Sequence, residues 1–244
     1  MSGRFALGAM ALIQRRDFEA ALREGEAALK ADPRHPGALQ LAGALHCQLG
    51  RPDKGAPLLE RSLALAENQT TRLNLAKALL DAGRAADARA VLRKSAPSPD
   101  AARLLGDVLK SSGDLSGAIA AFRDAVRQRP DYADAWNNLG NALRETGDLD
   151  AALEALMRAV QLNPRAATIQ LNLARALSAA DQPEAAFQAA QAALNLAPHD
   201  PHAKLESAKL HIVAERFDEA LTLLEAVAPA AGQRRRFLGG QGIG

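Results

Sequence analysis

The chain has 244 residues, with 30 Lys and Arg against 28 Asp and Glu, so its formal net charge of +2 gives no general attraction for nucleic acid or an anionic membrane. Its single cysteine excludes an intramolecular disulfide framework and a cysteine-based zinc cluster, and no apolar run approaches the ~20 residues of a membrane helix. The composition is 48% hydrophobic but only 3% aromatic, and it is rich in Ala and Leu, which favour helices. These features predict an all-α protein.

The N-terminal apolar run, residues 5–13, has two interpretations. It follows Arg4, as the core of a signal peptide would. However, Arg15 and Arg16 follow it, no small-x-small cleavage site closes it, and its residues fit the periodic pattern of the remaining chain. We therefore expect a first structural helix, and a cytoplasmic protein with no membrane segment.

A period of 34 residues then runs along the chain, and it shows in the spacing of small residues and prolines. It defines seven units: 2–35, 36–68, 69–98, 99–132, 133–166, 167–200 and 201 to about 232. The eighth and twentieth residues of every unit are Gly or Ala. Such small residues allow two antiparallel helices to cross closely, where a larger side chain would cost strain. Between the helices, pairs such as Gly147-Asp148 predict a turn that ends one helix and caps the next.

The third unit is irregular. It is four residues short and runs into Pro97 and Pro99, which prevent a continuous helix. We expect either a tolerated loop deletion or a hinge between two sub-arrays, residues 1–98 and 99–232. Pro57, in the second unit, is expected to shorten or kink a helix.

The last segment, residues 233–244, is rich in Gly and Arg and has no helical period, so we expect it to be a disordered tail. It cannot cap the apolar face of the final unit, which contains Leu221 and Leu224, although solenoids need such a cap. A partner, a second copy or a further domain is expected to cover that face. Self-association through this repeat is therefore one predicted interaction.

The unit 133–166 resembles the tetratricopeptide repeat (TPR). Eight of its residues match the TPR pattern at the right spacing: Trp136, Leu139, Gly140, Leu143, Ala152, Leu156, Ala159 and Pro164. The resemblance implies a right-handed superhelical solenoid of about seven helix-turn-helix units, which binds extended peptides in a concave groove lined by the first helices. It also implies a non-catalytic scaffold. The alternative is a substrate-recruiting arm of a larger or truncated glycosyl- or sulfotransferase-like enzyme.

No constellation of side chains points to catalysis, a cofactor or a metal. His46 and His211 occupy the same packing position of their units and are expected in the core. Cys47 is next to His46, but neighbouring residues on a helix point apart, so a structural thiol is expected. His199 and His202 form at most a weak metal site because the ligand set is incomplete. The glycines of residues 239–244 lack the strand and helix that a phosphate loop needs.

The resemblance also implies which residues line the groove, since positions 2, 5, 6, 9 and 12 of each unit face it. The predicted peptide-binding residues are Asn74, Lys77, Arg103, Asp107, Lys110, Asn137, Asn138, Asn141, Arg144, Asn172, Arg175 and Lys209. Asparagines at the sixth position suit a peptide backbone, although Leu104 and Glu206 interrupt that ladder. The excess of Lys and Arg favours an acidic segment or a C-terminal carboxylate, and the alternative is that these polar residues serve solubility. No nucleic-acid partner is expected.

Overall fold

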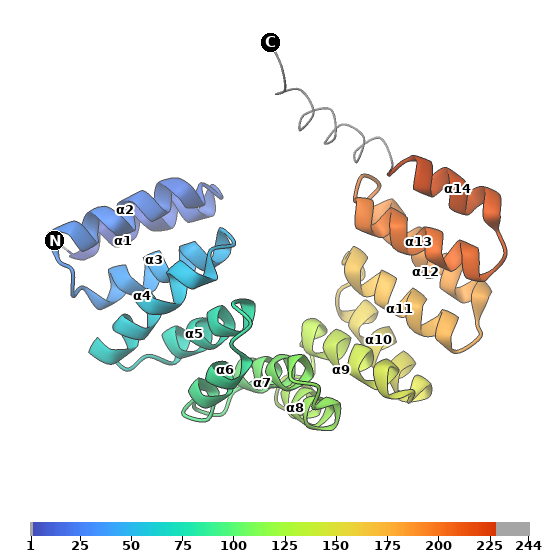
Figure 1. Ribbon diagram of the computed structural model, residues 1–244, viewed down its shortest axis with the longest axis horizontal. Helices are drawn as coiled ribbons and strands as arrows, with labels where there is room; N and C mark the ends of the chain where they lie inside the picture. Colours follow the sequence, from blue (N-terminus) through green and yellow to red (C-terminus); the bar gives the residue numbers. More distant parts are fainter. Residues whose placement is uncertain (1, 228–244) are drawn as a thin grey trace, which may run out of the picture. The chain divides into compact units, whose positions relative to one another are not determined.

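The computed structural model describes residues 2–227, and their side chains from residue 8 onward; the predicted tail 233–244 lies outside these residues. Within them the chain is all-α, as the composition predicts (Figure 1). The helices are α1 (Ser2–Gln14), α2 (Phe18–Ala31), α3 (Pro36–Gln48), α4 (Pro52–Leu65), α5 (Gln69–Asp81), α6 (Ala85–Leu92), α7 (Pro99–Ser111), α8 (Leu115–Gln128), α9 (Ala133–Thr146), α10 (Leu149–Leu162), α11 (Ala167–Ala179), α12 (Pro183–Leu196), α13 (Pro201–Val213) and α14 (Phe217–Glu225). Each odd-numbered helix packs against the next helix, which gives the seven expected pairs.

The turn inside each pair depends on one residue with left-handed backbone. The fifteenth residue of every unit has a positive φ: Arg16, Gly50, Gly83, Gly113, Gly147, Asp181 and Glu215. Glycine adopts this conformation freely, whereas other residues lose roughly 1–2 kcal/mol. In three units the next residue is an aspartate that caps the second helix. Asp114 Oδ1 accepts a hydrogen bond from the Gly117 amide at 2.9 Å, and Asp148 Oδ1 from the Ala151 amide at 3.4 Å, as the Gly-Asp pairs predict.

The helix crossing explains the small residue at the eighth position. A Cβ added to Gly106 would lie 2.4 Å from the Phe122 ring, and one added to Gly140 would lie 2.5 Å from Leu156 Cγ. Phe122 and Leu156 both occupy the twenty-fourth position and are fully buried. The second helix therefore packs a large side chain directly against the backbone of the first, in the space that a side chain at the eighth position would fill.

The irregular third unit keeps its first helix and loses length from its second. Helix α6 has 8 residues, whereas α8 and α10 have 14. Pro97 lies in the loop before α7, and Pro99 is the first residue of α7. Ser98 caps α7 by accepting a hydrogen bond from the Ala101 amide at 3.2 Å. Gln69 holds the connecting loop, because its side chain donates to Ala96 O at 3.0 Å and accepts from the Ala96 amide at 3.1 Å.

Pro57 does not shorten its helix, so that part of the expectation is wrong. Helix α4 has 14 residues, as do α2 and α10, with Pro57 at an exposed position inside it. The proline lies close to the start of the helix, where it removes one amide donor. The Asp53 carbonyl would have accepted that hydrogen bond, and Asp53 is exposed, so water can bond to the carbonyl instead.

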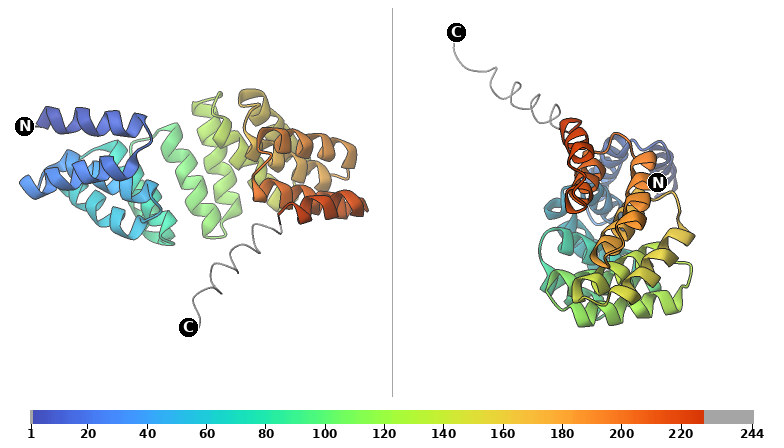
Figure 2. Two further views of the ribbon diagram at one scale, coloured as in Figure 1. Left: turned by 90° about the horizontal axis from the view of Figure 1, so that it is seen from above. Right: turned by 90° about the vertical axis from the view of Figure 1, so that its right-hand side faces the viewer.

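The chain divides after Gln128 into two compact units, Met1–Gln128 and Arg129–Gly244. In the first, α5 contacts both α3 and α7; in the second, α11 contacts both α9 and α13. Within each compact unit, a second helix contacts its own partner and the first helix that follows, as α4 contacts α3 and α5 and as α10 contacts α9 and α11. The first helices of successive repeats therefore form one layer within each compact unit, and the second helices form another (Figures 1 and 2). The sub-array boundary after residue 98 stays a prediction.

No helix among the described residues combines the length and apolar character that crossing a membrane requires.

The helix crossing can be tested by adding one methyl group. Gly140→Ala should lower the free energy of unfolding by about 1–3 kcal/mol, because the new Cβ overlaps Leu156 and the Ala152 carbonyl. Gly8→Ala is the matched control, since a Cβ there meets nothing within 4 Å and Gly is a poor helix former, so it should leave stability unchanged or raise it. Urea denaturation followed by far-UV circular dichroism measures both. Equal stability of the two variants would contradict the packing argument.

Candidate functional site

In the N-terminal compact unit, the predicted residues meet around two hollows of the first-helix layer. One hollow, of ≈ 230 Å³, lies between α3 and α5 and includes Cys47, Asn74 and Lys77 in its lining. The other, of ≈ 320 Å³, lies between α5 and α7 and is lined by Asn74, Lys77 and Arg103, among others. Asn74 and Lys77 face both hollows. The structure thus brings three of the predicted site residues together on neighbouring helices.

The cations of this surface have anionic partners on their own helices. Lys77 Nζ lies 2.7 Å from Asp81 Oδ2, and Arg103 Nη1 lies 2.6 Å from Asp107 Oδ2. The Lys77 pair is exposed and spans one helical turn, so it contributes only about 0.3–0.5 kcal/mol and can be exchanged for another carboxylate. Arg103 and Asp107 are more shielded. Lys110 is half-buried on the same helix.

In the C-terminal compact unit, the predicted residues form a continuous hydrogen-bonded row across α9, α11 and α13. Asn137 donates to Asn138 Oδ1 at 3.2 Å, and Asn172 donates to Asn137 Oδ1 at 2.8 Å. Arg175 Nη1 donates in turn to Asn172 Oδ1 at 3.0 Å. Asn172 is buried, which suits a side chain bonded on both sides. The asparagines of this unit therefore bond to one another, and their role in peptide binding stays a prediction.

Glu206, which stands where the asparagine ladder is interrupted, continues the row of hydrogen bonds. Arg175 donates to Glu206 Oε2 from Nε at 2.9 Å and from Nη2 at 2.8 Å, and Lys209 donates to Oε1 at 2.8 Å. The Glu206 side chain is only 12% exposed. Burial by itself raises the pKa of this carboxyl, but the hydrogen bonds and charges of Lys209 and Arg175 outweigh it, and the pKa lies below its usual value. Two predicted ligand-binding cations thus already hold an internal carboxylate.

A sequence signal for this contact exists. Arg175 is the ninth residue of its unit and Glu206 the sixth of the next, 31 residues later. The prediction compares the same position in every repeat. It therefore misses this pair, which joins two different positions of successive units.

Other predicted residues keep unused hydrogen-bonding groups. The side-chain amides of Asn74 and Asn141 make no hydrogen bond to any described residue. The half-buried Arg144 side chain likewise bonds to no residue within 2–227; its Nε is buried, so only the remainder of the guanidinium can meet a ligand. An amide both donates and accepts, as a peptide backbone requires. These three residues therefore have capacity left for a ligand.

Two histidines and the cysteine that were considered as catalytic candidates pack against other side chains of the fold. His46 is buried, and burial lowers the pKa of its imidazole. Burial also raises the pKa of the Cys47 thiol, which makes it a poorer nucleophile, and its Sγ fills the space that a Cβ on Gly55 would occupy. The His211 ring packs on Phe187 with 4.7 Å between centroids. Among the described residues, no group of three or more His, Cys, Asp or Glu is placed to hold a metal ion.

A stack of helix pairs with a polar first-helix layer defines an α-solenoid of the interaction-scaffold class. The sequence matches the tetratricopeptide repeat family over residues 7–70, 45–102, 103–167, 146–201 and 177–241. The chain belongs to the tetratricopeptide repeat family. No curated protein matches the sequence significantly.

Solved structures share the fold at low sequence identity. The Cut9–Hcn1 hetero-tetramer of the APC/C matches with a TM-score of 0.74 and 20% identity over 84% of this chain and 42% of that one. PilF of Pseudomonas aeruginosa matches with a TM-score of 0.60 and 24% identity over 66% and 75%. YrrB, a TPR protein with an unusual peptide-binding site, matches with a TM-score of 0.54 and 16% identity over 79% and 97%. This chain thus spans less than half of the Cut9–Hcn1 chain, and these identities establish the fold alone.

Removing the Glu206 carboxylate measures how much its ion pairs with Arg175 and Lys209 stabilise the fold. Glu206→Gln should lower the free energy of unfolding by about 1–3 kcal/mol, because Arg175 and Lys209 lose a shielded charge partner. Asp81→Asn, which breaks the exposed Lys77 pair, is the control and should cost less than about 0.5 kcal/mol.

The ion pairs of Glu206 also make the free energy of unfolding depend on pH. The pKa of Glu206 is lower in the folded chain than in the unfolded one, so its contribution is present above the ordinary pKa of 4.5 and is lost as the pH falls through the folded value. The stability difference between wild type and Glu206→Gln should therefore shrink below pH 4.5 in denaturation series. A difference that is constant from pH 7 to pH 3 would contradict the ion-pair assignment.

Proposed function

We propose that the chain is a non-catalytic protein–protein interaction scaffold that holds an extended segment of a partner on its first-helix layers. The observation that carries this proposal is the row of polar groups that successive first helices present, with spare amide and guanidinium groups at Asn74, Asn141 and Arg144. The matched peptide-binding structure of YrrB has the same fold, but the proposal for this chain depends on its own residues.

The spacing of the repeats suits an extended chain. Packed helices lie about 8–10 Å apart, and an extended peptide advances about 3.3 Å per residue. One first helix therefore corresponds to about three peptide residues, and one asparagine amide per helix can bond the backbone at this interval. Because such bonds go to the backbone, they hold a segment without specifying its sequence.

Charge would then select among segments. We propose that Lys77 and Arg144 receive an acidic side chain or a C-terminal carboxylate, because an incoming carboxylate can replace Asp81 at little cost and the half-buried Arg144 side chain bonds to no described residue. Arg103, Arg175 and Lys209 contribute less to such binding than their charge suggests, since Asp107 and Glu206 already neutralise them.

Two double variants test the proposal, one in each compact unit: Asn74→Ala/Lys77→Gln and Asn141→Ala/Arg144→Gln. Each should weaken partner capture at least about tenfold, as expected for two lost polar contacts. Arg158→Gln is the matched control, since it removes an exposed arginine from a second helix, α10. The measurement is quantitative affinity capture from the source lysate with unchanged melting temperatures. Undiminished capture by both double variants would refute the assignment of this surface.

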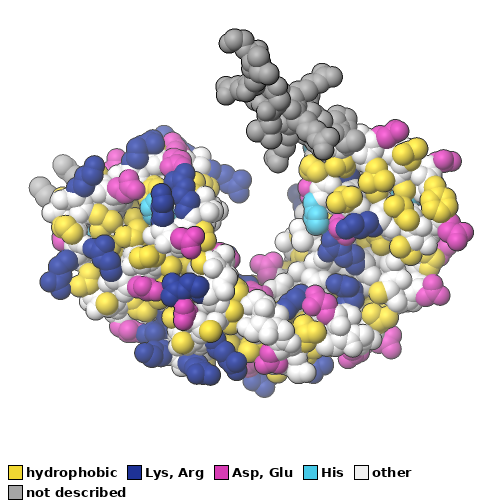
Figure 3. Space-filling model, in the orientation of Figure 1, with side chains coloured by type: hydrophobic (Ala, Val, Ile, Leu, Met, Phe, Trp, Pro, Cys, Tyr) yellow, Lys and Arg dark blue, Asp and Glu magenta, His cyan; other side chains and the backbone are white. Residues whose placement is uncertain are grey.

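A second copy of the chain is the other partner we propose, because the last helix pair exposes large apolar side chains. Phe217 is 62% exposed and Leu221 55%, and hydrophobic side chains gather over α13 and α14 (Figure 3). Light scattering over a concentration series should show a dimer that Phe217→Ser/Leu221→Ser dissociates. A monomer at every concentration would contradict self-association.

A further inference from the structure

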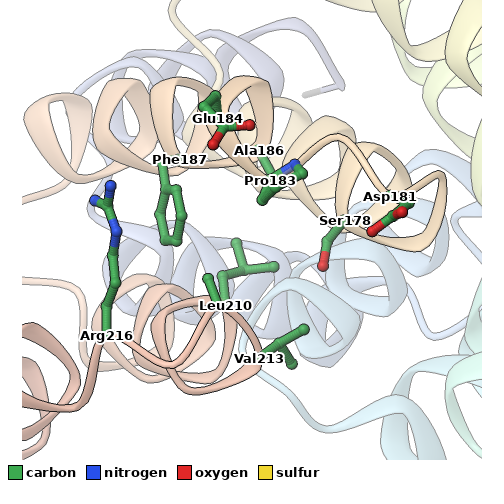
Figure 4. Close-up of a pocket in the computed structure, with 10 residues that line it drawn as sticks. Ser178, Asp181, Pro183, Glu184, Ala186, Phe187, Leu210, Val213 and Arg216 are labelled. Carbon is green, nitrogen blue, oxygen red and sulfur yellow. The ribbon is translucent and has the colours of Figure 1, made fainter.

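A separate pocket lies at one edge of the C-terminal compact unit, between α12 and α13 (Figure 4). It has a volume of ≈ 230 Å³, and its walls come from the end of α11, the first turns of α12, the end of α13 and the turn that follows. None of the twelve predicted peptide-binding residues lines it. It is therefore a different surface from the one described above.

The floor of the pocket is apolar, and not all of its apolar side chains are needed for packing between the repeats. Phe187 of α12 points towards Leu210 of α13, and Val213 lies beside them (Figure 4). Val213 is 71% exposed, so its methyl groups are not buried in the core. The thirteenth residue of the other six units is Gln14, Gln48, Asp81, Ser111, Glu145 and Ala179. Only at this pocket does that position carry a β-branched apolar side chain, which indicates an apolar contact beyond residues 2–227.

The aromatic wall of the pocket is held rigidly. The Arg216 guanidinium lies 4.3 Å from the centroid of the Phe187 ring, and the His211 ring packs on Phe187 as well. Arg216 stands at the N-cap of α14 and forms no side-chain cap, like Arg51 of α4 and Arg84 of α6. Its side chain lies over the Phe187 ring. A preorganised aromatic surface of this kind costs a ligand little ordering entropy.

Two carboxylates also stand around the pocket: Asp181 at the end away from Arg216, and Glu184 above Phe187 in the view of Figure 4. Asp181 and Glu184 line it, and neither makes an ion pair or side-chain hydrogen bond within residues 2–227. Asp181 has φ 55°, at the left-handed position that four other units give to glycine. A carboxylate is therefore retained at a strained backbone position, and strained residues tend to cluster where a ligand binds.

We propose that the α12–α13 pocket is a second binding site, which takes an apolar side chain of a protein partner with a Lys or Arg beside it. The apolar side chain packs on Leu210, Val213 and the Phe187 ring, and the neighbouring cation pairs with Asp181 or Glu184. Charge complementarity carries this choice of partner, because two carboxylates without a described partner favour a basic segment over an acidic one. The volume of the pocket fits one side chain, which the α12–α13 walls enclose from two sides.

Two substitutions that the chain's own repeats already use test the site. Val213→Gln places on the floor the residue that Gln14 and Gln48 supply in other units, and Asp181→Gly places the glycine found at Gly113 and Gly147. Both suit the fold, and Asp181→Gly relieves backbone strain, so its melting temperature should be equal to or higher than that of wild type. Weaker binding by a more stable protein would separate a binding role from a structural one.

The probe is a random twelve-residue peptide library displayed on phage and selected on the full chain, with counter-selection on Val213→Gln. Enriched peptides should share an apolar residue next to Lys or Arg. Synthetic labelled copies should bind each pocket variant about fivefold or more weakly, as for an interface hot spot, and should bind Asn141→Ala/Arg144→Gln as well as wild type.

Four results would overturn the proposal. They are no enrichment after counter-selection, enrichment of sequences without a basic residue, equal binding by both pocket variants, and loss of binding in the first-helix variant. Light scattering that shows Val213→Gln dissociating a dimer would assign the pocket to a second copy of the chain and would likewise overturn it.

Discussion

The close crossing of the two helices in each repeat is the contact on which the remaining structure depends. Gly106 and Gly140 have no side chain at the crossing, so Phe122 and Leu156 pack against the helix backbone and are fully buried. This contact sets the distance between the two helix layers. Because the same geometry recurs in successive repeats, neighbouring first helices lie side by side in each compact unit. The polar surface that they present follows from that stacking.

Contacts across the stack determine the character of this surface. In the C-terminal compact unit, Asn172 bonds Asn137 from the preceding repeat, and Arg175 bonds Glu206 from the following one. Such bonds satisfy half-buried polar groups and hold the first helices in register. They also reduce the charge that an incoming ligand meets. The binding capacity of the row therefore depends less on how many cations it contains than on which groups, such as Arg144, remain without a partner.

The residue with left-handed backbone in the turn of each repeat is not the same in all repeats. Four units use glycine at this position, which carries no conformational penalty. Arg16, Asp181 and Glu215 accept the penalty, and two of these three are carboxylates near the edge of the C-terminal compact unit. Exposed Val213 and the Arg216–Phe187 stack lie in the same region. Several departures from the repeat pattern thus lie around the pocket between α12 and α13.

The sequence alone determined the all-α class, the seven helix pairs, the glycine turns and the small residues at the crossings, since these depend on residues close together in the chain or repeated at a fixed period. The Arg103–Asp107 pair, one helical turn apart, was accessible to the same reasoning. Only the tertiary structure decided that Glu206 joins the polar row, because it meets Arg175 across 31 residues and two repeats. The Phe187–Arg216 stack likewise joins two repeats. Helix packing sets these distances, and no local pattern encodes them.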